Sequence, residues 1–405
     1  MKLAYLTTSF GTPSHTFIRR EIRELRKQNV DVLLYGVRPD PKVAPDAVDL
    51  DAETRFLYPI RIFETLLLNL YYAVFRFSRY WPALFDSILG KDLKLKQRMM
   101  LCYHLFVSVS HARHMEKCKI EHIHAHFLNS SSSISMFCSR LTGIPYSITV
   151  HSAGEKDLPH VIAIPEKLKH ASRLLMISKF NIGYYSELYP CQHKSDVVRC
   201  GMNIEEFDVR NTPVREDNAP INILAVGRFV EKKGFRYLIE AAKLVKDAGT
   251  NFEIEILGSG PLDDELRGLR DQLEVGDVVN FFGQASTAQV REKMLGADVV
   301  VVPSVTSQSG EMEGIPVVIM EAMATGVPVI ASAHSGIPEL VTEHTGYIVP
   351  EKDASALAAA ISNYSLDEDK IRAARKLIED TFNIRTVVAQ RIEIFMQNRL
   401  TKEAS

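Results

Sequence analysis

One short stretch in the C-terminal half decides the fold, and it reads EGIPVVIMEAMATG from Glu313 onward. Two carboxylates, Glu313 and Glu321, stand eight positions apart, and the residues between them are uncharged. Pro316 suits the first turn of a helix, where its missing N–H is not needed, and Gly326 suits the left-handed residue just past a helix end. The stretch therefore predicts a largely buried helix over Pro316–Thr325, with one glutamate before it and one inside it.

The start of this helix has the form of an anion site. Free N–H groups at residues 314–317 would point at whatever lies over the helix start, where the helix dipole also favours negative charge. An ionised carboxylate in so apolar a run is costly unless it finds partners, and Glu321 could accept hydrogen bonds from a sugar diol. Spacing alone fits equally well a helix with a favourable acid before it and one satisfied glutamate in the core.

Short apolar runs alternate with longer helical patterns along the whole chain. Continuous β-branched runs separated by helices argue for parallel sheets covered on both faces. The alternation pauses at 207–220, a polar stretch with two prolines. We predict an α/β protein with doubly wound halves at 1–206 and 221–383, a hinge at 207–220, and a C-terminal helix at 384–405.

Composition excludes several classes of protein. The chain has 405 residues, of which 46% are hydrophobic and 24% charged, and its net charge of −2 carries no nucleic-acid footprint. Its five cysteines are scattered without a Cys-x-x-Cys spacing, which indicates free thiols in a reducing cytosol. No uninterrupted apolar run reaches the roughly 18 residues of a membrane span, and the first residues predict a strand and not a signal peptide.

Two cations follow a predicted strand and precede a predicted helix. The loop reads GRFVEKKG, and it places Arg228 and Lys233 at the carboxyl end of the strand Ile223–Val226. This position suits a phosphate group. Cations are also common in solvated loops without any ligand, so both interpretations stand at this point.

Histidines follow or fill two other predicted strands. His151 ends the strand Tyr146–Val150, where it could donate to a sugar hydroxyl or be structural. His122, His124 and His126 alternate along one strand, so their side chains share a face. No carboxylate or thiol joins these three in the sequence, which favours packing or substrate contact over a metal site.

The pair Asp49 and Asp51 has the Asp-x-Asp spacing of metal-dependent sugar transferases. It lies in what we expect to be a polar loop, and solvated loop acids are the favoured explanation. We therefore predict no metal site.

Residues 55–119 differ in composition from the rest of the chain. They contain eleven Lys or Arg and four Asp or Glu, a local balance of +7, and ten aromatic residues between Phe56 and Phe85. Basic, aromatic and helical together are typical of a membrane-surface element. The alternative is a helical insertion that packs on the first half.

The residues from Ser309 to Glu339 resemble the Glu-x7-Glu signature of retaining glycosyltransferases of family 4. The variants MEGIPV and HSGIPE within them are most similar to the colanic-acid-type exopolysaccharide branch, and the loop containing Arg228 and Lys233 resembles the family's Gly-Arg-x4-Lys-Gly element. The resemblance implies the GT-B fold, in which two Rossmann-like domains face each other across a cleft. The N-terminal domain, 1–206, would bind the acceptor and the C-terminal domain, 221–383, the nucleotide sugar, and the C-terminal helix at 384–405 would cross back to the N-terminal domain. The resemblance also implies a metal-independent hexosyltransferase that uses a nucleotide-diphosphate sugar as co-substrate and no cofactor.

Residue roles follow from the same resemblance. Arg228 and Lys233 would hold the donor diphosphate, and His151 and Glu313 would act as catalytic groups beside the donor sugar. Further donor contacts are implied for Gly314, Ile315, Pro316 and Glu321. The acceptor would be a hydroxyl of a growing, lipid-linked surface glycan, reached from the cytoplasm at the inner face of the plasma membrane, with 55–119 in contact with anionic lipid and no nucleic-acid partner. A sugar-nucleotide epimerase on the same fold and a noncatalytic sugar-nucleotide-binding subunit are the alternatives.

Overall fold

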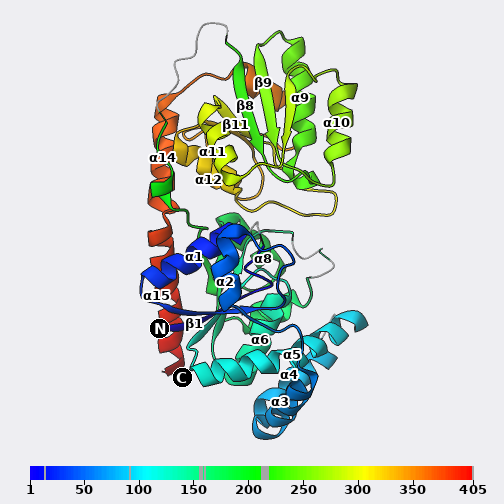
Figure 1. Ribbon diagram of the computed structural model, residues 1–405, viewed down its shortest axis with the longest axis vertical. Helices are drawn as coiled ribbons and strands as arrows, with labels where there is room; N and C mark the ends of the chain where they lie inside the picture. The colour runs from blue at the N-terminus through cyan, green and yellow to red at the C-terminus, as the bar shows by residue number, and fades with distance from the viewer. Residues whose placement is uncertain (13–14, 91–92, 155–157, 159–160, 211–218, 404–405) are drawn as a thin grey trace.

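Two parallel sheets lie one above the other in the computed structural model (Figure 1). The structure describes residues 1–405 except 13–14, 91–92, 155–157, 159–160, 211–218 and 404–405. The predicted hinge falls largely on 211–218 and so lies mostly outside the described residues. Helices cover both faces of each sheet, which confirms the expected α/β class. Within the described ranges, none of the helices combines the length and the apolar character that crossing a bilayer requires.

The N-terminal sheet has seven strands in the order β3-β2-β1-β4-β5-β6-β7. Its strands are β1 Lys2–Thr7, β2 Asp31–Gly36, β3 Arg55–Phe56, β4 His122–His126, β5 Tyr146–Val150, β6 Arg173–Met176 and β7 Ser195–Val197. Its helices are α1 Thr16–Lys27, α2 Val48–Glu53, α3 Ile62–Phe75, α4 Phe77–Leu89, α5 Leu95–Cys118, α6 Ser130–Thr142, α7 Ile164–His170 and α8 Lys179–Leu188. The chain winds outward from β1 in one direction and returns through β4 in the other, so the strand order reverses between β1 and β4.

The C-terminal sheet has six strands in the order β10-β9-β8-β11-β12-β13 and reverses between β8 and β11. Its strands are β8 Ile221–Val226, β9 Phe252–Leu257, β10 Val279–Gly283, β11 Val299–Val302, β12 Val329–Ser332 and β13 Tyr347–Val349. Its helices are α9 Phe235–Asp247, α10 Asp263–Gln272, α11 Thr287–Gly296, α12 Val317–Thr325, α13 Ala354–Ser362 and α14 Glu368–Thr381. Ligands in such sheets bind beyond the carboxyl ends of the strands at the reversal point.

Local sequence explains the elements that matter for the site. β11 is four consecutive valines, all buried, as a strand covered on both faces requires. α12 ends at Gly326, which has φ +75° and accepts the left-handed cap without strain. Pro316 is the N-cap of α12 with an extended ψ of 127°, so the helix begins at Val317 and not at Pro316 as the sequence suggested.

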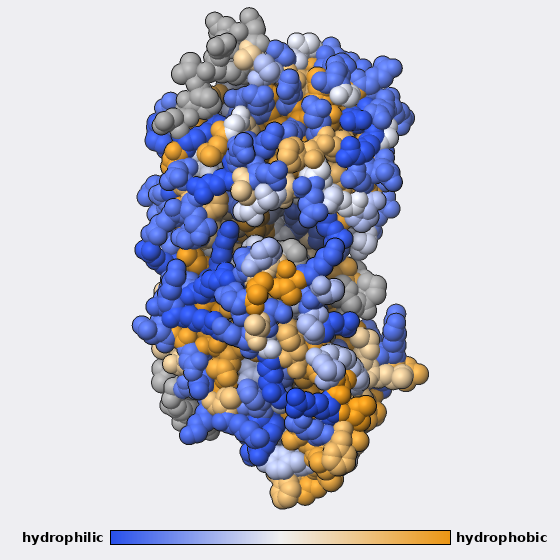
Figure 2. Space-filling model, viewed as in Figure 1, coloured by the Kyte–Doolittle hydropathy of each residue, from blue (hydrophilic) through white to orange (hydrophobic). Residues whose placement is uncertain are grey.

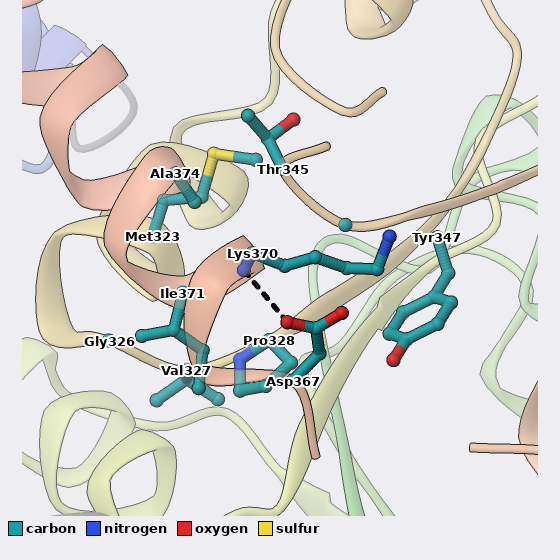
Figure 3. Close-up of a pocket in the computed structure, with 11 residues that line it drawn as sticks. Met323, Gly326, Val327, Pro328, Thr345, Tyr347, Asp367, Lys370, Ile371 and Ala374 are labelled. Carbon is teal, nitrogen blue, oxygen red and sulfur yellow. Dashed lines mark hydrogen bonds between the residues drawn. The ribbon is translucent and has the colours of Figure 1, made fainter. Parts of the chain in front are cut away.

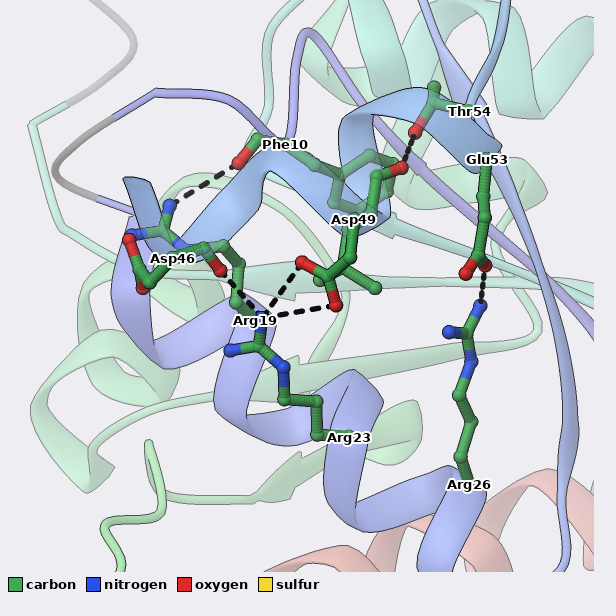
Figure 4. A network of polar contacts seen from close by, with 9 residues as sticks. Phe10, Arg19, Arg23, Arg26, Asp46, Asp49, Glu53 and Thr54 are labelled. Carbon is green, nitrogen blue, oxygen red and sulfur yellow. Dashed lines mark hydrogen bonds and ion pairs between the residues drawn. The ribbon is translucent and has the colours of Figure 1, made fainter. Parts of the chain in front are cut away.

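Three arginines on α1 bind the acids of the segment around α2 (Figure 4). Arg19, which is only 1% exposed, holds Asp46 through two bonds of 2.9 Å. One and two turns further on, Arg23 donates to Asp49 at 3.0 Å and Arg26 donates to Glu53 at 2.6 Å. The expected polar loop at Asp49 is therefore wrong: the residue lies in α2, and its carboxylate fastens α2 to α1.

The C-terminal helix α15, Ile384–Glu403, lies against α1 in the N-terminal half (Figure 1). Val388 and Phe395 join the core formed by β1 and α1. Arg391 is fully buried there, 3.1 Å from Glu21 and 2.8 Å from the hydroxyl of Thr149. The last helix of the chain thus supplies both apolar surface and a charge to the first half.

Replacing Arg391 with Met is expected to destabilise the protein by about 3–5 kcal/mol, because it leaves the carboxylate of Glu21 buried without its cation. The double variant Arg391→Met, Glu21→Gln should recover part of that loss, since it removes both charges. Chemical denaturation followed by circular dichroism measures both. A single variant that unfolds at the wild-type midpoint would contradict the role of this pair.

Candidate active site where the two sheets meet

The site forms where the carboxyl ends of β5 and β6 approach loops of the C-terminal half. The two halves approach closely at Gly314, where an added Cβ atom would lie 2.1 Å from the carbonyl oxygen of His151, and at Gly154, where a Cβ would lie 2.1 Å from the carbonyl oxygen of Gly310. No side chain fits in either space, so glycine is required at both positions. Gly314 lies two residues before Pro316, the N-cap of α12, and the contact therefore brings the end of β5 close to the start of that helix.

A carboxylate from the C-terminal half caps a helix of the N-terminal half. Glu339 accepts hydrogen bonds from the backbone N–H groups of Lys179 at 3.1 Å and Phe180 at 2.9 Å, at the first turn of α8. Arg199 also donates to Glu339, at 2.6 Å. Anions are stabilised at helix N-termini by free N–H groups and the helix dipole, and the arginine adds an opposite charge. Glu339 thus bridges the two halves at the side of the site.

Glu313 and Lys233 form an ion pair on the C-terminal side of the site. Lys232 is the next cation, with its Nζ 3.9 Å from the same carboxylate. Burial raises the pKa of Glu313, but the two lysines outweigh burial and hold that pKa below its usual value. Glu313 is therefore ionised, and its negative charge compensates the positive charge of Lys233 in this conformation.

His334 fixes the backbone at Glu313. The N–H of Glu313 donates to His334 Nε2 at 3.1 Å, so the ring carries its proton on Nδ1, which donates to Glu351 at 2.8 Å. Burial lowers the pKa of His334, although Glu351 opposes this shift, and the lowered value favours the neutral ring that the bonding pattern requires. Glu351 also accepts from the N–H of Thr306 at 2.9 Å. This chain of bonds sets the loop that leads into α12.

The start of α12 offers N–H groups that no other described residue occupies. Within the described part of the chain, no acceptor is bonded to the N–H groups of Gly314, Ile315 and Val317. Further along the helix, Glu321 is half-buried, and burial raises its pKa while Arg20 on α1 lowers it. The nearest charge that acts on Glu321 thus belongs to the other half of the molecule.

Arg228 lies just after β8 and its side chain is exposed. In the described residues its guanidinium has neither a hydrogen bond nor an ion pair. Lys233 crosses the backbone of the same loop, 3.2 Å from where a Cβ of Gly227 would lie. The turn after β9 supports this loop: Gly258 has φ +152°, and a Cβ there would lie 1.8 Å from the carbonyl oxygen of Gly227.

His151 lies at the floor of the site and is 8% exposed. Its Nε2 is 2.9 Å from His126 Nδ1, and its Nδ1 is 3.6 Å from the sulfur of Cys200. Burial, reinforced by Arg391, lowers the pKa of His151 well below its ordinary value. Both ring nitrogens are thus engaged inside the N-terminal half, and it is the carbonyl of His151 that meets Gly314.

A carboxylate does join the histidines of β4, contrary to the sequence-based expectation. Glu21 on α1 lies with His124 and His126 in a buried group whose ligand atoms are all within 4.8 Å of one another. Arg391 already supplies the positive charge at Glu21, and Tyr5 donates to the same carboxylate at 2.5 Å. The expectation failed because Glu21 lies more than a hundred residues before His124 in the chain, so no local spacing joins them. The group is a buried polar network, and it fits an internal ion pair better than a metal.

A pocket behind α12 does not belong to the site (Figure 3). Apolar Met323, Val327 and Ile371 line it, between α12 and α14. The one hydrogen bond drawn there, from the N–H of Lys370 to Asp367 at 3.1 Å, is the N-cap of α14. The pocket is a packing feature that supports α12 from behind.

Comparison with known proteins identifies the C-terminal half. Residues 209–381 match the family model of glycosyl transferases group 1. This part of the chain is a group 1 glycosyl transferase domain. It contains the loop with Arg228 and Lys233 as well as α12 with both glutamates, so the family resemblance predicted from the sequence is confirmed.

Relatives of the chain are named for the biosynthesis of amylovoran and of colanic acid. The chain is 29% identical to the amylovoran biosynthesis glycosyltransferase AmsK of Erwinia amylovora, over 97% of this chain and 99% of AmsK. It is 41% identical to the putative colanic acid biosynthesis glycosyltransferase WcaL of Escherichia coli K12, over 52% of this chain and 53% of WcaL. The latter alignment thus spans about half of each protein.

Solved structures share the arrangement of both sheets. Sucrose-phosphate synthase from Thermosynechococcus elongatus superposes with a TM-score of 0.71 at 20% identity, and each chain is covered completely. Anabaena HepE in complex with UDP and glucose superposes with a TM-score of 0.70 at 16% identity, over 98% of this chain and 100% of HepE. At this identity the likeness concerns the fold alone, and it confirms GT-B.

Sequence reasoning missed four residues of the site region. Glu339 was quoted as the end of a motif without a role, and Glu351, His334 and Arg199 were not singled out. Their partners are 17 to 160 residues away in the chain, so no local spacing marks them. The one feature of the sequence that could have marked Glu339 as a site residue is its position in the segment HSGIPE, where an acid follows the end of a predicted strand.

Replacing Glu339 with Gln is expected to loosen the contact between the halves, because its bonds to N–H groups and to Arg199 are charge-assisted and contribute about 1.5–3 kcal/mol. Amide hydrogen exchange at Lys179 and Phe180 should accelerate about 10- to 100-fold, as that free energy implies. Glu343→Gln is the matched control, since that acid is 84% exposed. Unchanged exchange in the Glu339 variant would contradict the bridge.

Proposed function

We propose that the protein transfers a hexose from a nucleotide-diphosphate sugar to a hydroxyl of a growing, lipid-linked surface glycan. The observation that carries the proposal is the meeting of Glu313, Lys233 and the start of α12 at the edge of the group 1 glycosyl transferase domain, against His151 of the other half. A cation, unoccupied N–H groups and an ionised carboxylate in one place suit a substrate with a diphosphate and a sugar. The nucleotide-diphosphate sugar is the co-substrate, and no separate cofactor or metal is part of the proposal.

The diphosphate would be held by Arg228 and Lys233. Lys233 is bound to Glu313 in this structure, whereas Arg228 is exposed. Donor binding would therefore exchange one partner of Lys233: the ammonium turns to a phosphate oxygen, and Glu313 is released to accept from sugar hydroxyls. The N–H groups of Gly314 and Ile315, together with the dipole of α12, would meet the donor beside Pro316.

The nucleoside would extend along α12 to Glu321. A carboxylate can accept hydrogen bonds from both hydroxyls of a ribose diol, and among the described residues no hydrogen bond to the side chain of Glu321 would have to be displaced. Its half-buried position keeps competing water away from such bonds. This role of Glu321 does not depend on the nucleobase of the donor, since every ribonucleotide carries the same ribose diol.

Transfer with retention requires attack from the face that the diphosphate leaves. The bond between the anomeric carbon and the diphosphate oxygen breaks, and the acceptor oxygen forms a bond to that carbon on the same face. The proton of the acceptor hydroxyl passes to the departing phosphate oxygen. Neutralisation of the leaving diphosphate by fixed cations is the main electrostatic task, and closure of the two halves limits hydrolysis by water.

The names of the relatives support our choice of acceptor, and the composition of residues 55–119 supports our choice of location. Relatives are named for colanic acid and amylovoran biosynthesis, which supports a surface polysaccharide as the product. We place the enzyme in the cytoplasm at the inner face of the plasma membrane, in peripheral contact with anionic lipid through 55–119. Neither alternative would need an acceptor. An epimerase would release the epimer of the donor sugar, and a noncatalytic binding subunit would form no product.

A radiolabelled donor panel tests the proposal directly, and Arg228→Ala and Lys233→Ala should each lose most of the transfer while remaining folded. Both substitutions remove a cation from the leaving diphosphate. Lys243→Ala is the matched control, because this lysine pairs with Asp247 on the surface of α9. Free epimer without transfer would establish the epimerase alternative, and near wild-type turnover in either variant would remove that residue from the site.

Glu321→Gln is expected to weaken binding of the free nucleoside diphosphate about 10- to 100-fold, since charge-assisted bonds contribute roughly 1.5–3 kcal/mol. Burial raises the pKa of Glu321, so the wild-type affinity should begin to fall at a higher pH than an exposed glutamate would cause. The Gln variant should lack this pH dependence. Calorimetric titration measures both effects, and equal affinity of a folded variant would assign Glu321 to the structural core of α12.

A further inference from the structure

The helices α3 and α4 and the start of α5 project from the end of the N-terminal half that is remote from the C-terminal sheet (Figure 1). Figure 2 shows apolar residues gathered on this projection. Among the residues whose burial the structure describes, 24 large hydrophobic side chains are exposed, and fourteen of them lie between 62 and 103; we call the first eleven of these, on α3 and α4, the α3–α4 ridge. Its members are Ile62, Phe63, Leu66, Leu67, Leu70, Val74, Phe75, Phe77, Phe85, Ile88 and Leu89.

The polarity of α3 is inverted relative to a helix on the surface of a soluble domain. Its buried residues are Thr65, Asn69 and Tyr72, whereas Phe63 is 76% exposed and Phe75 is 72% exposed. A surface helix of a globular domain presents its apolar face to the core and its polar face to water. The outward face of α3 is therefore built for an environment other than water.

Hydrogen bonds hold this inverted orientation in place. Asn69 donates to the carbonyl of Phe106 on α5 at 3.0 Å and accepts from the hydroxyl of Tyr80 on α4 at 2.9 Å. On α4, Ser87 is buried and Leu89 is 68% exposed. Rotating α3 to hide the apolar face would break these hydrogen bonds and would also withdraw Tyr72 and Leu68 from the core against which they pack.

The charges around the ridge select its partner. Arg61 is 82% exposed at one end of α3, and Lys94 and Lys96 are exposed at the start of α5. Two copies of the chain that met through this face would bring these cations together. An anionic lipid surface instead offers them phosphate groups and offers the ridge an apolar phase.

We infer that the α3–α4 ridge inserts into the acyl region of an anionic lipid monolayer. The inference deepens the membrane contact of the proposed function, but the ridge shares no residue with the donor site. Insertion differs from adsorption by charge alone: salt screens the contribution of Arg61, Lys94 and Lys96, whereas the burial of apolar surface persists. The cations then set the orientation of the protein on the membrane.

The only tryptophan of the chain, Trp81, reports insertion without a label. It lies on α4 between Phe77 and Phe85, with ring centroids 6.2 and 6.0 Å away. The experiment uses the full chain with vesicles of phosphatidylethanolamine and phosphatidylglycerol, with and without bromine on the acyl chains. Bromine quenches a tryptophan that enters the acyl region, and sedimentation at 0.1 and about 1 M salt separates apolar from ionic binding.

Three variants make the test specific. The ridge variant Phe63→Ser, Phe75→Ser, Leu89→Ser leaves the rings beside Trp81 intact. The matched control Leu244→Ser, Leu366→Ser, Met396→Ser changes residues that are 43–48% exposed on other surfaces. The charge variant is Arg61→Gln, Lys94→Gln, Lys96→Gln.

We expect wild type and control to sediment with vesicles at both salt concentrations and brominated lipid to quench Trp81. The ridge variant should lose at least tenfold in partition coefficient, and the charge variant should lose less and only at low salt. Binding that high salt abolishes, absence of quenching, or a ridge variant that sediments like wild type would each overturn the inference. The inference would also be overturned if light scattering showed a dimer of the wild-type chain that dissociates in the ridge variant but not in the other two variants. A chain that inserts but transfers no sugar would overturn the proposed function and leave the inference standing.

Discussion

The close approach of Gly314 to the carbonyl of His151 is the constraint on which the site depends. It brings the end of β5 in one half against the start of α12 in the other, with no room for a side chain between them. Glu313 precedes this contact, so its carboxylate turns toward Lys233, and its N–H is held by the neutral ring of His334. One backbone contact thus determines where a carboxylate, a cation and the free N–H groups of a helix converge.

Buried charge supports this contact from the N-terminal side. Arg391 reaches from α15 to Glu21, and the adjacent histidines of β4 lie between this pair and His151. Burial lowers the pKa of His126 and His151, so both rings stay neutral near an arginine and do not repel it. The C-terminal helix therefore does more than cover α1, because the position of the site floor depends on a charge that arrives from the last element of the chain.

Sequence alone was sufficient for what local patterns encode. The period of apolar residues predicted both sheets, and the run from Glu313 to Gly326 predicted α12 apart from its first residue. Arg228 and Lys233 could be singled out as candidates because they follow a strand. Glu339, His334 and Arg391 were not, since each acts through a partner in another part of the fold. The inverted polarity of α3 could not be predicted from the sequence either. The composition of the segment shows that it is rich in aromatic and basic residues, but only the packing shows which face of the helix is buried.

The position of the α3–α4 ridge gives the two halves unequal tasks. The ridge belongs to the half that would take the acceptor, and it lies at the end away from the C-terminal sheet (Figure 1). On the proposed function, a half that is fixed to lipid would keep a lipid-linked acceptor at a constant distance from the membrane, whereas the half with Lys233 and α12 would stay in the aqueous phase where a nucleotide sugar is dissolved. The contacts of Glu339 and Gly314 would then lie where the dissolved donor meets the anchored acceptor. Glu339 contributes to this contact through hydrogen bonds to two N–H groups and an arginine, which water can replace, so opening of the two halves for the exchange of donor and product would not have to expose a new charge to an apolar surface there.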